Sequence, residues 1–143
     1  MNGTLDVRNF TRSRISSAVF EEARAHVLPD WDISLVFAGE IRAQKLNTAL
    51  RKKDYIPNVL SYEAGAKSGE IIICPPIAKK QAPRYGLSPT HFMLFLFIHG
   101  LLHLKGYPHG ATMERLERAT LARFIRTESL KHFIHGTTHR DRH

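Results

Sequence analysis

The chain has 143 residues, 43% hydrophobic and 24% charged, which is the composition of a single globular domain large enough to bury a core. Its 21 lysines and arginines outnumber its 13 aspartates and glutamates, and the net charge of +8 favours a polyanionic partner, above all nucleic acid. Because Cys74 is the only cysteine, no internal disulfide can form, which fits a reducing compartment. Its apolar neighbours predict that the Cys74 side chain is buried.

The first part of the chain predicts strands that alternate with helices. A short strand is expected at residues 5–9, and apolar residues at helical spacing predict a helix over 15–27. Residues 32–38 alternate and then become apolar, which predicts a second strand. A second helix is expected over 40–51, and it ends in the basic run Arg51-Lys52-Lys53.

The middle of the chain predicts a β-hairpin and a short helix. Two strands are expected at 58–62 and 70–74, joined by a turn at 64–69 that is rich in glycine and small residues. The proline pair at 75–76 suits the entry to a helix, which we expect over 77–85.

Two further helices are predicted after residue 88. Ser88-Pro89-Thr90 has the composition of a helix start, and Gly106 that of a helix end, so a long apolar helix lies between them. An amphipathic helix begins at Ala111. Its apolar face is expected to carry Met113, Leu116, Thr120, Leu121 and Phe124. Its solvent face is expected to carry Glu114, Arg115, Glu117, Arg118 and Arg123.

These elements predict an α+β fold with one domain over residues 1–126, in which helices pack on a small mixed β-sheet. Residues 127–143 form a basic tail with several histidines, which we expect to be a solvated end that binds metal only adventitiously. The N-terminus lacks the apolar stretch of a signal peptide, and the apolar run 92–98 is too short to cross a bilayer. We therefore expect a cytoplasmic protein without a membrane partner.

Three histidines in the long helix and the turn after it predict a metal site. His99 and His103 are one helical turn apart, so their rings project from one face of the helix. A helix that ends at Gly106 can turn back and bring His109 to the same place. Three imidazoles with one open position are typical of catalytic zinc, whereas structural zinc usually has four protein ligands. Chance spacing among nine histidines is the alternative, and the helix-ending glycine argues against it.

The motif from His99 to His109 resembles H-G-x-L-H-L-x-G-Y-D-H of the YbeY family, bacterial endoribonucleases specific for single strands. It differs at Pro108, where the family has aspartate. Further similarity to the family's pattern covers about residues 40–125. It includes Leu46-Asn47, Arg51, Lys53-Asp54, Asn58-Val59-Leu60-Ser61, Gly69-Glu70-Ile71 and the acidic segment 113–117.

The resemblance implies one zinc ion bound by His99, His103 and His109, and an Arg51 guanidinium that handles the substrate phosphate. These four residues are therefore the candidate catalytic residues. The resemblance also implies a role in maturation of the 16S ribosomal RNA 3′ end and in ribosome quality control. The expected partners are single-stranded or ribosomal RNA and the small ribosomal subunit. Without the resemblance, Arg51 would be interpreted as a solvated helix end that interacts with the helix dipole.

Two other functions compete with an endoribonuclease. The first is a non-catalytic factor of ribosome assembly that binds ribosomal RNA and uses zinc structurally. Pro108 keeps this interpretation open, because the chain lacks the family's aspartate, which could assist proton transfer. The second is a metzincin-like protease with the same histidine spacing. That chemistry needs a glutamate directly after the first histidine, where this chain has Gly100, so the protease is the weaker alternative.

Overall fold

The computed structural model describes residues 3–125. Strands and helices follow one another in an α+β order, as predicted. They are β1 (Thr4–Asn9), α1 (Ala18–Val27), β2 (Asp32–Phe37), α2 (Glu40–Arg51), β3 (Val59–Glu63), β4 (Ser68–Ile73), α3 (Pro75–Gln81), the 3-10 turn η1 (Ala82–Tyr85), α4 (Pro89–Lys105) and α5 (Ala111–Phe124). The histidine-bearing tail 127–143 lies outside the described residues, so the domain boundary at 126 stays a prediction.

The sheet is mixed, with four strands in the order β1-β2-β4-β3. β1 and β4 both run parallel to β2, whereas β3 pairs antiparallel with β4 as the predicted hairpin. Parallel neighbours need a crossover, and α1 supplies the one between β1 and β2. β3 is therefore an edge strand, and no other strand of residues 3–125 pairs with its outer side.

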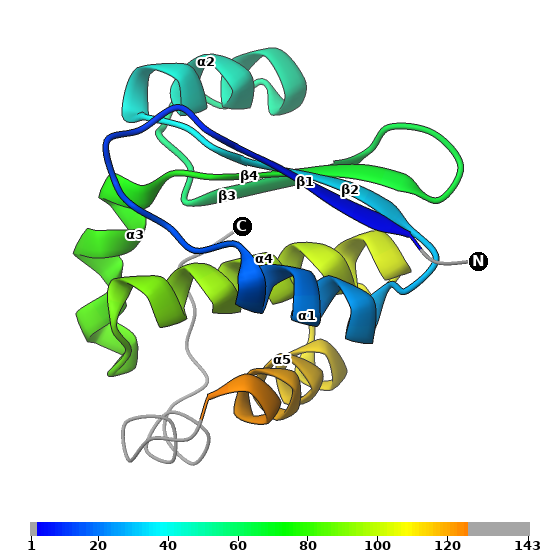
Figure 1. Ribbon diagram of the computed structural model, residues 1–143. Helices are drawn as coiled ribbons and strands as arrows, with labels where there is room; N and C mark the ends of the chain where they lie inside the picture. Colours follow the sequence, from blue (N-terminus) through cyan, green and yellow to red (C-terminus); the bar gives the residue numbers. More distant parts are fainter. Residues whose placement is uncertain (1–2, 126–143) are drawn as a thin grey trace.

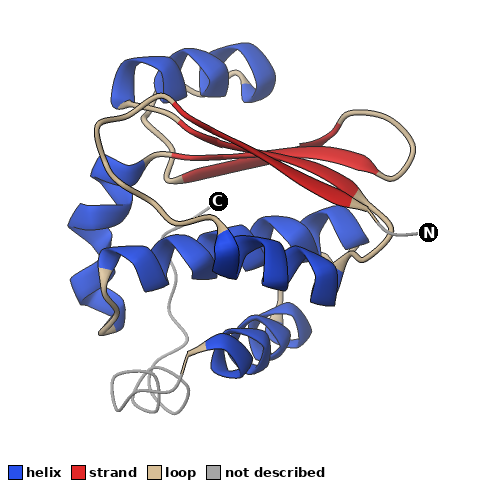
Figure 2. Ribbon diagram, in the orientation of Figure 1, coloured by secondary structure: helices blue, strands red, loops and turns tan. Residues whose placement is uncertain are grey.

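Helices cover the two faces of the sheet unequally (Figure 1, Figure 2). α1 and α4 lie on one face, α5 lies beyond them, and α2 lies alone on the opposite face. The main core is on the α1/α4 side, where Phe20, Phe37 and Phe97 are fully buried and meet edge to face. Almost every residue of α4 from Phe92 to Leu104 is buried. α4 is thus the central helix of the domain, and its few polar side chains must find partners inside the protein.

Two helix starts differ from prediction for local reasons. α1 begins at Ala18 rather than at residue 15, because the Asn9 side chain accepts hydrogen bonds from Thr11 and donates to the Ser13 carbonyl, which holds this segment in a turn. α3 begins at Pro75 rather than at residue 77, since prolines in the first helical turn lose no internal hydrogen bond. The predicted helix 77–85 is completed by η1.

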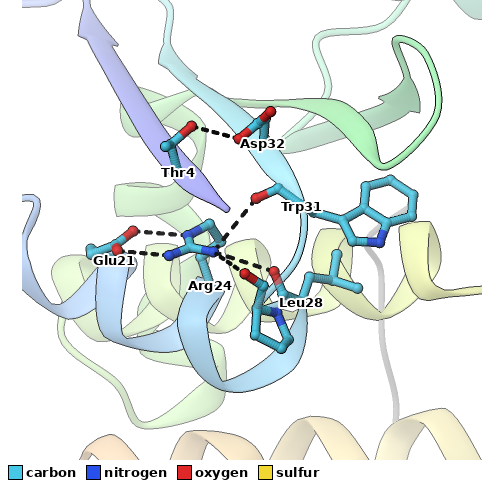
Figure 3. Close-up of polar contacts among 7 residues, drawn as sticks. Thr4, Glu21, Arg24, Leu28, Trp31 and Asp32 are labelled. Atoms are coloured by element: carbon cyan, nitrogen blue, oxygen red, sulfur yellow. Dashed lines mark hydrogen bonds and ion pairs between the residues drawn. The ribbon is translucent and has the colours of Figure 1, made fainter. Parts of the chain in front are cut away.

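A buried arginine joins the end of α1 to the start of β2 (Figure 3). The Arg24 guanidinium donates to both carboxylate oxygens of Glu21, at 2.9 and 2.7 Å, and to the Pro29 carbonyl at 3.1 Å. Arg24 is only 3% exposed, so its charge relies on these acceptors. The same hydrogen bonds lower the pKa of Glu21 from its usual value and raise that of Arg24.

Among the described helices, none is by itself long and apolar enough to cross a membrane. The segment Pro75–Tyr85 and α4 reach that length and composition only when taken together, and they are bent by 99° relative to each other.

Candidate metal centre and cleft

Local capping interactions define both ends of α4, the helix that carries His99 and His103. At the start, the Ser88 hydroxyl accepts a hydrogen bond from the His91 N–H. At the end, Gly106 has φ +112°, a conformation that side-chain-bearing residues rarely adopt. The N–H groups of Gly106 and Tyr107 donate to the carbonyls of His103 and Leu102, which closes the helix and reverses the chain.

The chain reversal brings the three histidines together. One ring nitrogen from each of His99, His103 and His109 lies within 4.8 Å of those of the other two. The Nε2 atoms of His103 and His109 are 2.8 Å apart, a distance at which one ring donates a hydrogen bond and the other accepts it. Three imidazole nitrogens on converging side chains are a donor set that fits zinc and similar ions.

Exposure differs along the cluster. His99 is only 2% exposed, whereas His103 is partly exposed and His109 is exposed. The cluster therefore has a protein side at His99 and an open side at His103 and His109. A metal bound here would be accessible to solvent and to a substrate on that open side.

Glu117 contradicts the prediction that it faces solvent, since it is completely buried. Its carboxylate contacts Nδ1 of His99 from α5. A carboxylate that accepts the Nδ1 proton fixes the ring orientation and leaves Nε2 as the ligand nitrogen. The sequence did contain a signal for this burial, because Glu117 lies four residues from both Met113 and Leu121, which are on the buried face of α5.

The contact with Glu117 changes the interpretation of Pro108. At that position the family has an aspartate, whose carboxylate could assist proton transfer. Here a carboxylate reaches the cluster from α5 instead, and His109 joins the other two rings although proline precedes it.

A pocket of about 190 Å³ opens beside the exposed histidines. Its lining combines the metal cluster with residues from α2 and the edge strand β3. The lining residues are Arg51, Val59, Leu60, Ser61, His103 and His109. Arg51 stands at the last residue of α2, where its guanidinium lies 3.5 Å from the Tyr55 hydroxyl. The structure thus places all four candidate catalytic residues around one cluster and its pocket.

Two other residues of the family's pattern lie elsewhere. The Asn58 side chain is buried and donates to Gln81 Oε1 at 2.8 Å, which is a structural role. Glu70 contacts the hydroxyls of Tyr62 and Ser34 and lines a separate hollow with Leu46 of α2. Glu70 therefore does not belong to the metal cluster.

Gly100 has no room for the glutamate that a metzincin-like protease requires. A Cβ atom at this position would lie 3.1–3.3 Å from three side-chain atoms of Ile71 on β4. A side chain at this position would press against Ile71, which would have to shift. The packing of α4 on the sheet thus disfavours the protease interpretation independently of the missing base.

Comparisons with known proteins agree with this geometry. Residues 3–133 match the sequence model of a family described as Endoribonuclease YbeY. The chain belongs to the YbeY family. This membership confirms the resemblance and extends it to the N-terminal strand and helix, which lie outside the residues 40–125 that first suggested it.

Several curated YbeY proteins are similar to this chain. The protein named Endoribonuclease YbeY from Thiobacillus denitrificans is 37% identical over 105 residues, which is 66% of this chain and 71% of the relative. The protein of the same name from Aromatoleum aromaticum is 31% identical over 120 residues, which is 82% of this chain and 78% of the relative. The solution structure of TM1509 from Thermotoga maritima has the same fold, with a TM-score of 0.64 and 21% identity over 83% of this chain and 87% of that one.

Proposed function

We propose that this YbeY-family chain is a zinc-dependent endoribonuclease that cleaves phosphodiester bonds of single-stranded RNA. The observation that carries the proposal is one pocket lined by Arg51 together with two of the three clustered histidines. The family name supports the reaction. The net charge of +8 supports a polyanionic substrate.

The residues of the pocket divide the chemistry between them. His99, His103 and His109 would hold one zinc ion, which supplies a Lewis acid and a source of nucleophile near neutral pH. Arg51 is placed to donate paired hydrogen bonds to the phosphate as its negative charge develops, which a lysine would do less well. Glu117 accepts the Nδ1 proton of His99 and so holds that ring in its ligating orientation.

The biological substrate is inferred from the family. We infer that the enzyme matures the 16S ribosomal RNA 3′ end in the cytoplasm, acts in ribosome quality control and meets its substrate on the small ribosomal subunit. The alternative is a non-catalytic assembly factor with structural zinc. The exposure of His103 and His109 to a pocket favours the enzyme, because structural zinc sites are usually closed.

The test is cleavage of a labelled single-stranded RNA by wild-type protein and His103→Ala, prepared in parallel without an affinity tag, with and without a chelator. His91→Ala is the matched control, since it removes a histidine from the same helix outside the cluster. We expect cleavage by zinc-loaded wild type and His91→Ala, and none by His103→Ala or after chelation. RNA binding without cleavage in the wild type would favour the assembly factor. Equal cleavage in all samples would indicate a contaminating nuclease and remove the support for the enzyme.

A further inference from the structure

The edge strand β3 presents main-chain groups to the pocket. In an antiparallel pair, alternate residues direct their N–H and C=O groups to the partner strand, and the residues between them direct theirs away from it. Cys74 N–H donates to the Asn58 carbonyl, and Ala64 N–H donates to the Ser68 carbonyl. With the register Leu60↔Ile72 between them, these bonds show that the even-numbered residues of β3 bond to β4.

The odd-numbered residues therefore face away from the sheet. Val59, Ser61 and Glu63 direct their N–H and C=O groups to the outer side of β3, where the described part of the chain places no strand. Val59 is 2% exposed, Ser61 is partly exposed and Glu63 is exposed. Ser61 is thus the outward-facing residue of β3 that is both partly exposed and part of the pocket lining, whereas Glu63 does not line that pocket.

The surroundings of Ser61 favour RNA as the molecule that binds there. The pocket carries His103 from α4, His109 from the turn after it and Arg51 from α2, so the outer edge of β3 shares one pocket with the metal cluster and a cation. An extended peptide could also pair with a free strand edge, but the exposed guanidinium and the net charge of +8 favour a phosphate-bearing chain.

The outward N–H and C=O of Ser61 are complementary to the edge of a nucleobase. The N–H and C=O of one outward residue are a donor and an acceptor side by side, as are the groups on the Watson–Crick edge of a base. In a duplex, that edge is occupied by the paired base, whereas in a single strand it is available to a protein. A main chain that binds this edge therefore discriminates against double-stranded RNA without any charged side chain.

We propose that the main chain of β3 at Ser61 binds the Watson–Crick edge of a nucleobase next to the scissile phosphate, and that this contact selects single-stranded RNA. The proposal rests on the proposed endoribonuclease function and assigns its strand selectivity to a sheet edge. Arg51 and the histidines then act on the phosphate, while Ser61 holds the base.

Proline substitution tests the contact because it removes one N–H group. Ser61→Pro removes the outward donor and leaves the bonds of Leu60 and Tyr62 to β4 in place, and proline is tolerated on edge strands. Glu63→Pro is the matched control, since it removes the equivalent donor two residues along the same edge, outside the pocket. Ser61→Ala separates the loss of the hydroxyl from the loss of the N–H. Circular dichroism and thermal melting show whether each variant folds.

The first readout is the dissociation constant of each metal-free protein for single-stranded RNA at several salt concentrations. We expect Ser61→Pro to bind about five- to tenfold more weakly than Ser61→Ala and Glu63→Pro, the effect of losing one hydrogen bond. Its dependence on salt should equal that of the wild type, because no phosphate contact is lost. The single-strand preference of zinc-loaded Ser61→Pro, measured as the ratio of kcat/KM for single- and double-stranded RNA, should fall by a similar factor.

A second readout uses wild-type protein and therefore does not depend on the folding of a variant. N3-methyluridine next to the cleavage site blocks the Watson–Crick edge, whereas 5-methyluridine leaves it free. We expect only the first to reduce cleavage. The proposal for β3 is overturned if Ser61→Pro and Glu63→Pro bind RNA alike and the wild type cleaves RNA that carries N3-methyluridine. The proposed nuclease activity would stand in that case, because the wild type still cleaves. If the wild type neither binds nor cleaves RNA, the proposed function itself fails.

Discussion

Removing the Glu117 carboxylate should weaken metal binding and also destabilise the metal-free protein. Glu117→Leu deletes the group that accepts the His99 Nδ1 proton, whereas Glu117→Gln retains an acceptor oxygen and loses the charge. Glu117 is fully buried and His99 is 2% exposed, so water cannot replace the lost partner. Loss of a hydrogen-bond partner behind a metal ligand typically costs about 10- to 100-fold in affinity, or about 1.4–2.7 kcal/mol.

We expect the full loss in Glu117→Leu and a smaller loss in Glu117→Gln. The metal-free Glu117→Leu protein should also be less stable, because the buried Nδ1–H of His99 loses its acceptor, at a cost of about 1–3 kcal/mol. Glu117→Gln keeps an acceptor oxygen and should lose less stability. Weaker zinc binding by Glu117→Gln at nearly unchanged thermal stability would separate a positioning role from a purely structural one.

The assay is competition for zinc between the protein and a chromophoric chelator, with thermal melting of each metal-free protein. Glu114→Gln is the control, because it removes a carboxylate from the same helix at a partly exposed position. If Glu117→Leu is folded and binds zinc within twofold of the wild type, then the buried carboxylate does not orient His99. If Glu114→Gln loses as much affinity as Glu117→Gln, the effect is one of overall charge.

Three further predictions concern the fold that holds the site. Arg24→Met should lower the free energy of unfolding by about 2 kcal/mol in urea, because hydrogen bonds from a charged group to Glu21 and the Pro29 carbonyl are lost. Since the pKa of Glu21 is lowered in the folded protein, the stabilisation from this pair should be present above pH 4.5 and lost as the pH falls below it. A difference in the free energy of unfolding between wild type and Arg24→Met that stays constant from pH 7 to acid would contradict this. Gly100→Ala should lower the melting temperature, because crowding of Ile71 at a cost of about 1–3 kcal/mol exceeds the roughly 1 kcal/mol that alanine gains over glycine inside a helix; a melting temperature equal to or above that of the wild type would refute this. Burial raises the pKa of the Cys74 thiol, so a thiol reagent at neutral pH should label it only after unfolding, and rapid labelling of the native protein would refute its burial.

The features that the sequence by itself determined are those set within one element. His99 and His103 share a helix face because they are four residues apart, and Gly106 ends that helix because it adopts φ +112°. These are local consequences of backbone geometry, so the three-histidine cluster could be predicted without any knowledge of packing. The hairpin β3–β4 was predictable for the same reason, since its turn and its alternation lie in neighbouring residues.

Tertiary structure decided what depends on contacts between distant elements. Glu117 was assigned to solvent because a glutamate is rarely buried, and only the packing of α5 against α4 supplies the His99 partner that makes its burial tolerable. The position of Arg51 beside the histidines depends on how α2 and β3 are placed, and the family resemblance rather than any spacing suggested it. The outward side of β3 at Ser61 likewise follows from strand order, because a sequence shows which residues form a strand but not which strand is left at the edge.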